Sequence, residues 1–440
     1  MKKRLFAVAA AFCILCLLFC SCDKKKEQPA PEPSSAVCRT ISFPTAEGIG
    51  AAIAALEKNA EKDDGTDYDE ARPMSEAVVY VTLADGNTVV TDKNGNPYPD
   101  GYADVSGDIL HIRKAGTYEL TGSLSDGQII VGTDDRVQLI FRGVSISCSD
   151  RPAIEIYGTG KKVITLARGS DNRLSDGPGR ADATKDGVIR AAHAVTIDGK
   201  GSLEIASKFG SGICADAIKV IDSSLIVSEA KTDALLSGAF LLLSHANVTL
   251  SCLGRALFAP DEIILSGASL SARGGIVARD VFIDGSTVDL ASREDGISAT
   301  RLISAQNSSL SIDAEGDGLR AKGEDPTAID GIVRLYECAT VVTDGDDGIR
   351  ARYFSFSGGS LFCVGMGTQL CVTEGAVCSW NIDEILLPDG IAAGSELRLS
   401  EIKVTLKRKG RIVAFIYAKP YDQMEFCVDD KAVLGFSCVE

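Results

Sequence analysis

Several features typical of nucleic-acid-binding proteins and common enzymes are absent from this sequence. Lys and Arg number 45 against 61 Asp and Glu, which gives a formal net charge of −16 and a pI near 4.8. Phosphate binding needs a basic surface, so a nucleic-acid partner is excluded. The sequence contains no G-x-S-x-G, P-loop or H-E-x-x-H motif, and its three histidines have no partner at a recognisable spacing: His111, His193 and His245. We interpret these histidines as structural.

Tryptophan is nearly absent, and the cysteines lack metal-binding spacing. A single tryptophan, Trp380, argues against a flat platform of indole rings for crystalline cellulose. Four of the 14 cysteines lie in the first 22 residues, and the other ten form no C-x₂-C pair. We interpret most of these as small buried residues. The candidate disulfide pairs are Cys371 with Cys378 and Cys427 with Cys438.

The N-terminus has the pattern of a targeting segment. A basic "MKKR" precedes the apolar "LFAVAAAFCILCLLFC", and "SC" follows. We therefore predict a lipoprotein signal peptide over 1–22, with the lipid attached to Cys22 and the protein tethered at the cell envelope. Ordinary secretion is the alternative, and Cys20 is a second candidate for the lipid. Residues 23–37, rich in Lys, Pro and Ser, predict a flexible tether.

What the sequence has in abundance is a repeat of about 21 residues. Turn phrases such as "KDGVI", "EDGIS", "GDGLR" and "DDGIR" recur at successive spacings of 25, 22, 22, 19, 21, 22 and 30 residues. Such a unit is too short for a helix plus strands, but it fits one coil of three short strands that stacks on its neighbours. The leucine-rich repeat needs leucines and an asparagine ladder that are missing, and a propeller blade is about twice as long.

These spacings predict an all-β fold, a right-handed parallel β-helix over residues 105–383; the hand follows the general preference of parallel crossovers. We expect an N-terminal capping region over 38–104, with a short helix at 46–62 where apolar residues recur at helical spacing. Residues 384–440 leave the repeat and predict a C-terminal cap of antiparallel strands, which would cover an open sheet edge.

Stacking aligns the acidic turns of successive coils. Five aspartates fall in one column of the alignment, and four further acids directly precede them; the nine are Asp186, Asp233, Asp295, Asp317, Asp347, Glu294, Glu315, Asp344 and Asp346. Carboxylates stacked about 5 Å apart repel each other, and a hard cation between them reverses that effect. Calcium prefers 6–8 oxygen ligands. We predict a composite calcium site, with seven candidate ligands: Asp186, Asp295, Glu315, Asp317, Asp344, Asp346 and Asp347. The alternative is that the aspartates cap turns and that Arg320 and Arg350 neutralise them.

Three segments are similar to known proteins: "AGTYELTGSLSDGQIIVGTDDRVQLIFRGVSIS", "VTIDGKGSLEIAS" and "GDGLRAKGEDPTAIDGIVRLYECATVVTDGDDGIRA". They resemble a family of bacterial carbohydrate-binding β-helix proteins. The resemblance runs over about residues 105 to 368. It implies a fold similar to that of polysaccharide lyases, calcium bound between coils, and binding of cellulose and acidic sugars without demonstrated cleavage. The family's turn acids correspond to Asp186, Asp295, Asp317 and Asp347. The middle coils have "SGIC", "DALL", "GRAL" and "GGIV" instead, so we place the calcium at the C-terminal coils.

Three functions are consistent with this sequence. The first is non-catalytic, calcium-assisted binding of an acidic polysaccharide, in which calcium bridges uronate carboxylates. The second is a polysaccharide lyase acting by calcium-assisted β-elimination, with Lys322 as the nominated base; the missing cluster of basic residues argues against it. The third is a structural or adhesin lipoprotein of the envelope, whose acids only cap turns.

Overall fold

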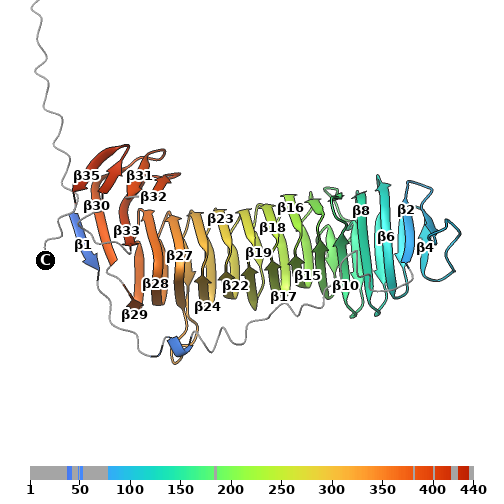
Figure 1. The fold of residues 1–440 in the computed structure, drawn as a ribbon, viewed down its shortest axis with the longest axis horizontal. Helices are drawn as coiled ribbons and strands as arrows, with labels where there is room; N and C mark the ends of the chain where they lie inside the picture. Colours follow the sequence, from blue (N-terminus) through green and yellow to red (C-terminus); the bar gives the residue numbers. More distant parts are fainter. Residues whose placement is uncertain are drawn as a thin grey trace, which may run out of the picture.

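The chain forms an elongated parallel β-helix of about 12 coils (Figure 1). The structure is a computed structural model of residues 1–440, and it describes residues 37–41, 48, 50–52, 78–182, 186–379, 382–399, 402–417 and 425–435. The predicted fold class is confirmed. The described residues do not include 1–36. The predicted signal peptide, the lipidation of Cys22 and the flexible tether up to residue 36 therefore stay predictions.

The coils are built from parallel strands that form three sheets around one core. They begin with β2 (Val78–Leu83), which pairs in parallel with β6, so the parallel pairing starts earlier than residue 105. The remaining strands of the coils are β5 (Ile109–Ile112), β6 (Gly116–Leu124), β7 (Gln128–Gly132), β8 (Val137–Cys148), β9 (Ile154–Tyr157), β10 (Lys162–Leu166), β11 (Asp171–Asp176), β12 (Ile189–Ala191), β13 (Ala194–Gly199), β14 (Ser202–Ala206), β15 (Ile213–Ile221), β16 (Ser224–Glu229), β17 (Leu235–Ser244), β18 (Asn247–Ser251), β19 (Leu257–Phe258), β20 (Glu262–Ser266), β21 (Ser269–Arg273), β22 (Ile276–Asp284), β23 (Thr287–Ser292), β24 (Ile297–Gln306), β25 (Ser309–Ala314), β26 (Leu319–Ala321), β27 (Ile332–Thr343), β28 (Ile349–Gly365) and β29 (Leu370–Cys378).

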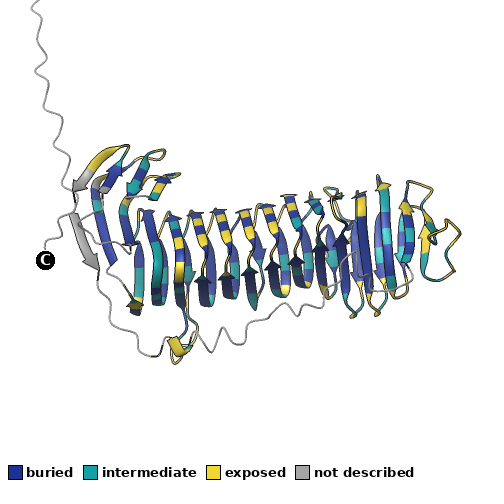
Figure 2. Cartoon of the chain, in the orientation of Figure 1, coloured by how far each residue is buried: buried dark blue, intermediate teal, exposed yellow. Residues whose placement is uncertain are grey.

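The core consists of apolar side chains stacked in register from coil to coil. In the sheet that contains β10 and β13, one inward position is filled along the rod by Ile164, Ile197, Val220, Leu243, Leu265, Ile283, Ala305, Leu335 and Phe356. All of them are buried. Within many of the strands, buried and exposed positions alternate, and this pattern repeats from coil to coil (Figure 2). Each fully buried aliphatic side chain stabilises the fold by roughly 1.5–3 kcal/mol. The alternation therefore fixes the register of every strand, because a slip by one residue would turn the apolar side chains outward.

Strands at both ends of the rod cover the open edges. At the N-terminal end, β3 (Val89–Thr91) pairs antiparallel with β2, and β4 (Ala103–Ser106) pairs antiparallel with β5. At the C-terminal end, β33 (Gly410–Tyr417) pairs antiparallel with β28 and with β30 (Ile382–Ile391). A separate antiparallel sheet, in the order β32-β31-β34-β35, packs beside them: β31 (Glu396–Leu399), β32 (Ile402–Thr405), β34 (Glu425–Val428) and β35 (Lys431–Gly435).

The region from residue 38 to 104 is divided between the two ends of the molecule. Strand β1 (Val37–Ile41) pairs antiparallel with β30 at the C-terminal end, whereas β2 to β4 lie at the N-terminal end. Of the helix predicted at 46–62, the structure describes helical residues 50–52. Ala52 packs against an apolar cluster on the outer side of the coils, which includes Leu242 and Phe282. The described helical residues therefore lie along the side of the rod and not over its end.

Cys371 and Cys378 are free thiols, so the disulfide predicted between them is absent. Both lie on β29, where extended backbone separates them. Cys427 is also a free, buried thiol, and Cys438 lies outside the described residues. Among the described helical residues, none belongs to a helix with the length and hydropathy of a membrane span.

Candidate functional site

The acidic turns lie where the chain passes from one sheet to the next. They precede the strands whose first core residues are in register: Ile213, Leu235, Leu257, Ile276, Ile297, Leu319, Ile349 and Leu370. We call the positions two residues before these the turn column; they are Ser211, Asp233, Arg255, Gly274, Asp295, Asp317, Asp347 and Thr368. The stacking of Asp295, Asp317 and Asp347 in consecutive coils is therefore as predicted.

Asp186 does not belong to the turn column, contrary to the alignment. Ile189 pairs with Ile213, which places Gly187 opposite Ser211. The Asp186 carboxylate nevertheless accepts hydrogen bonds from the backbone N–H of Ser211 at 2.8 Å and from its hydroxyl at 2.7 Å. Asp186 also lies five coils before Asp295, roughly 24 Å along the rod at about 4.8 Å per coil. It cannot share a metal ion with the C-terminal acids.

Each aspartate of the turn column caps the turn of the next coil. One carboxylate oxygen accepts the backbone N–H of the following member of the column. The four donor–acceptor pairs are Arg255 to Asp233 at 2.7 Å, Asp317 to Asp295 at 3.1 Å, Asp347 to Asp317 at 3.2 Å, and Thr368 to Asp347 at 3.0 Å. These bonds satisfy turn donors that the parallel ladders leave unpaired. The structural role of the acids, considered above as the alternative to metal binding, is thus present whether or not a cation binds.

At the C-terminal coils the second carboxylate oxygens converge. Oxygens of Asp317, Asp346 and Asp347 lie within 4.8 Å of one another. The Arg350 guanidinium reaches all three carboxylates: its Nη2 lies 2.7 Å from Asp347 and 3.5 Å from Asp346, and its Nε lies 3.3 Å from Asp317. The hydrogen bond to Asp347 and the charges of the three acids raise the pKa of Arg350. An ion binding at this cluster would displace this guanidinium from at least one carboxylate.

Asp344 is the least compensated acid of this region. Its side chain is 1% exposed, and burial raises its pKa to about 8. Gln369 donates to one carboxylate oxygen at 3.4 Å, while the other oxygen has no hydrogen-bond partner. The amide oxygen of Gln369, which is fully buried, is also unpaired. A proton on Asp344 or a bound cation would satisfy these two buried acceptors.

The charges around the cluster do not balance. Five carboxyl groups lie here, and with Asp344 protonated near neutral pH because burial raises its pKa to about 8, four of them are charged: Asp295, Asp317, Asp346 and Asp347. Two guanidinium groups face them, because Arg350 is joined by Arg320, which lies 3.3 Å from Asp295. The remaining predicted ligand, Glu315, is half exposed and lies 3.5 Å from Arg408 of the cap. Glu315 is therefore engaged outside the cluster. Neither Gln369 nor the Arg408 contact was predictable from the sequence, because neither belongs to the repeated phrase.

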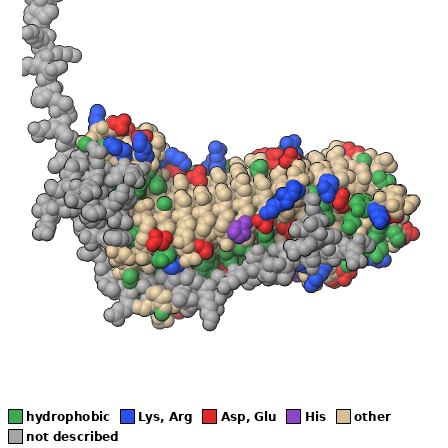
Figure 3. Space-filling view, viewed as in Figure 1, with side chains coloured by type: hydrophobic (Ala, Val, Ile, Leu, Met, Phe, Trp, Pro, Cys, Tyr) green, Lys and Arg blue, Asp and Glu red, His purple; other side chains and the backbone are tan. Residues whose placement is uncertain are grey.

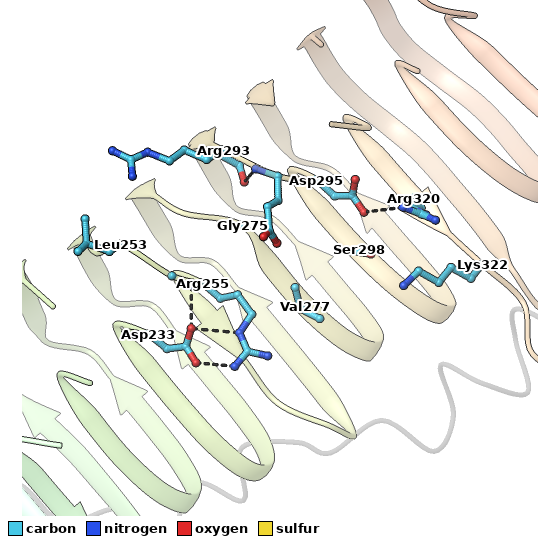
Figure 4. Close-up of a pocket in the computed structure, with 13 residues that line it drawn as sticks. Asp233, Leu253, Arg255, Gly275, Val277, Arg293, Asp295, Ser298, Arg320 and Lys322 are labelled. Atoms are coloured by element: carbon cyan, nitrogen blue, oxygen red, sulfur yellow. Dashed lines mark hydrogen bonds and ion pairs between the residues drawn. The ribbon is translucent and has the colours of Figure 1, made fainter. Parts of the chain in front are cut away.

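A second feature is a recess of about 810 Å³ over the middle coils (Figure 4). It lies between the turn of Gly254 and Arg255 on one side and the turn of Arg293 to Asp295 on the other. Lys322, the residue nominated as a lyase base, lines this recess. Lys322 and Asp317 stand on opposite sides of β26, five residues apart, which is about 16 Å of extended chain.

Comparison with known proteins identifies the family. A family model described as "Carbohydrate-binding domain-containing protein" matches residues 106–263 and 254–413. The chain belongs to this family of carbohydrate-binding domain-containing proteins, which confirms the resemblance noted in the sequence. A protein of the same description from Acetivibrio thermocellus is 30% identical over 126 residues, or 27% of this chain and 44% of the relative. The match thus spans less than half of that relative.

One solved structure is also similar. It is titled as the polysaccharide lyase-like protein from C. thermocellum, in a gadolinium derivative. The alignment covers 69% of this chain and 97% of that chain, with 18% sequence identity and a TM-score of 0.31.

Proposed function

We propose that this protein binds an acidic polysaccharide without cleaving it, and that a calcium ion held by the C-terminal coils assists the binding. The observation that supports this proposal is the convergence of Asp317, Asp346 and Asp347, with the buried Asp344 nearby. While Asp344 holds its proton, the four carboxylates of Asp295, Asp317, Asp346 and Asp347 exceed the two guanidinium groups by two negative charges, and a divalent cation would balance this excess. Calcium would bring a positive charge to which uronate carboxylates of a ligand bind.

The donor set suits calcium. Calcium takes carboxylate and amide oxygens, and both kinds are present here in unpaired form, on Asp344 and Gln369. Zinc is disfavoured because it prefers nitrogen and sulfur ligands, and the described acidic group contains neither histidine nor cysteine. We assign Asp317, Asp346 and Asp347 as the primary ligands. Asp344 and Gln369 are the candidates for completing the shell.

The lyase alternative receives less support. It needs a base and a calcium-bound carboxylate at one sugar ring, but Lys322 stands about 16 Å of extended chain from Asp317 across β26. The purely structural alternative is supported by the hydrogen bonds that the turn column makes between coils. A calcium test must therefore use a variant that leaves those bonds intact. We further propose that the protein is lipidated at Cys22 and held at the cell envelope; this rests on the N-terminal sequence alone.

Asp346 offers the sharpest test, because it is an exposed member of the cluster and caps no turn of the neighbouring coil. We expect calcium to raise the thermal unfolding midpoint of the wild-type protein by several degrees relative to chelator, since an ion bound only by the folded state stabilises it. Asp346→Asn should lose much of that rise while keeping the midpoint in chelator. Asp289→Asn, an exposed acid on β23, is the matched control and should respond as the wild type does. Equal thermal unfolding midpoints of the wild type with calcium and with chelator would refute the calcium mechanism.

A further inference from the structure

The recess over the middle coils exists because one coil is short. The turn between β21 and β22 contains only Gly274 and Gly275, since β21 ends at Arg273 and β22 begins at Ile276. The turns on either side, at 252–256 and 293–296, contain five and four residues. The short turn stays close to the core while its neighbours project on both sides. The cavity between them measures about 810 Å³.

The bottom of the recess is fixed by close packing. Gly274 has a φ of +136°, a backbone conformation that favours glycine. A Cβ on Gly275 would come within 2.4 Å of the backbone oxygen of Asp295. Neither position accepts a side chain without movement of the backbone, and the small side chains of Val277 and Ser298 are among those that line the recess. The recess is therefore a built feature of the coil and not a gap left by a mobile loop.

Two of the four cations around the recess are already neutralised. Arg255 forms two hydrogen bonds to Asp233, at 3.0 and 2.6 Å, and its guanidinium stacks 3.7 Å from the ring centroid of Phe258. Arg320 lies 3.3 Å from Asp295. These two ion pairs are balanced in charge.

The other two cations are free to meet a ligand. Among the described residues, neither Arg293 nor Lys322 has an acidic partner within ion-pair distance. Figure 4 shows Lys322 extending from its coil back toward Val277 and Ser298, over the recess, with Arg293 at the rim. These two cations lie together at one recess. Their placement indicates an anionic ligand group.

The remaining lining suits a sugar ring. Leu253 at the rim is 59% exposed and offers an apolar contact for the C–H face of a pyranose. Glu294 and Ser298 supply oxygens to which hydroxyl groups can donate. The volume is that of an ordinary small-ligand site, and such sites combine apolar contact with a few polar groups.

We propose that this recess binds one carboxylated sugar unit directly, through Lys322 and with help from Arg293, and without a metal ion. The proposal rests on the proposed function only in taking a polysaccharide as the ligand. The recess lies two coils from Asp317 and three from Asp347, roughly 10 and 14 Å along the rod at about 4.8 Å per coil. A sugar chain lying along the rod would then meet a cation-lined subsite first and the acidic cluster next.

The test is a calorimetric titration of the purified protein in the presence of chelator. A galacturonate trimer is the probe, and a galactose trimer is the neutral comparison. We expect binding of the acidic trimer alone. Lys322→Gln should weaken it about tenfold or more, since a charge-assisted contact is lost, and Arg293→Gln should weaken it less. Lys93→Gln, the same change in the distant turn after β3, is the matched control and should bind as the wild type does.

Three results would overturn the proposal: no binding of the acidic trimer in chelator, equal binding of the neutral trimer, or unchanged affinity in Lys322→Gln. Asp346→Asn separates this proposal from the calcium mechanism. We expect that variant to bind the trimer normally in chelator while losing its calcium-dependent stabilisation. If instead the calcium effect is absent from the wild type and the trimer still binds, the calcium mechanism fails and the recess stands.

Discussion

Replacing Asp344 by Asn should remove a pH dependence of stability that the wild-type protein shows without calcium. Burial raises the pKa of Asp344 in the folded protein from 3.8 to about 8. The folded state therefore holds a proton that the unfolded state releases above pH 4, and stability falls as pH rises from about 4 to about 8. Each pH unit in that window costs up to about 1.4 kcal/mol. Between pH 4 and pH 7 the wild type should lose up to roughly 4 kcal/mol through this one group.

The assay is urea unfolding at pH 4, 5, 6 and 7 in chelator, followed by the fluorescence of Trp380, which comes two residues after the end of β29. The relevant quantity is the free energy of unfolding of Asp344→Asn minus that of the wild type. This difference should rise by several kcal/mol across the series. Asp346→Asn is the same substitution at an exposed position, and its difference should change far less across the series. A difference for Asp344→Asn that does not change with pH would refute the reasoning. Saturating calcium should flatten the wild-type slope, because an ion near Asp344 favours its ionised form.

Three further substitutions test how the coils are held together. Asn172 is buried and makes four hydrogen bonds. Its amide oxygen accepts from the backbone N–H groups of residues 143 and 144, and its amide nitrogen donates to oxygens of residues 170 and 202. Asn172→Ala should reduce the free energy of unfolding, measured in urea, by about 2–4 kcal/mol. Gly359 has a φ of +82°, and a Cβ there would come within 2.0 Å of the Cys338 backbone oxygen. Gly359→Ala should therefore lower the thermal unfolding midpoint by many degrees. An unchanged midpoint would contradict this packing. Arg180→Met leaves the fully buried Asp176 without its 2.6 Å partner and should cost roughly 3–5 kcal/mol, measured by urea unfolding at pH 7.

The coils were predictable from the sequence because a solenoid repeats its contacts. Each coil touches only its neighbours, so the spacing of turn phrases directly reports the coil length. The same logic placed Asp295, Asp317 and Asp347 above one another, and the register confirms it. It failed at Asp186, because a one-residue difference in turn length changes the column and is visible only from the pairing of Ile189 with Ile213.

Contacts between the coils and the ends of the chain were not predictable. Glu315 looked like a ligand from its place before Asp317, but Arg408, far along the chain in the cap, lies 3.5 Å from its carboxylate. Strand β1 pairs with β30 across more than three hundred residues of chain. No periodic signal records such pairings. The short coil under the recess is visible in the sequence, because the spacing between its turn phrase and the preceding one is 19 residues.

The surface seen in Figure 3 carries acids and bases in scattered groups, with a broad tan area of backbone and other side chains along the coils. Such a face leaves room for a long polar ligand, and the family to which the chain belongs binds carbohydrate by its description. We propose that the C-terminal coils bind an acidic polysaccharide with the help of calcium. Affinity electrophoresis of the purified protein through gels containing polygalacturonate, with calcium or with chelator, tests this directly. We predict retardation that is stronger with calcium and is reduced in Asp346→Asn. Equal mobility in gels with and without the polymer, both with calcium and with chelator, would show that the protein does not bind this polymer.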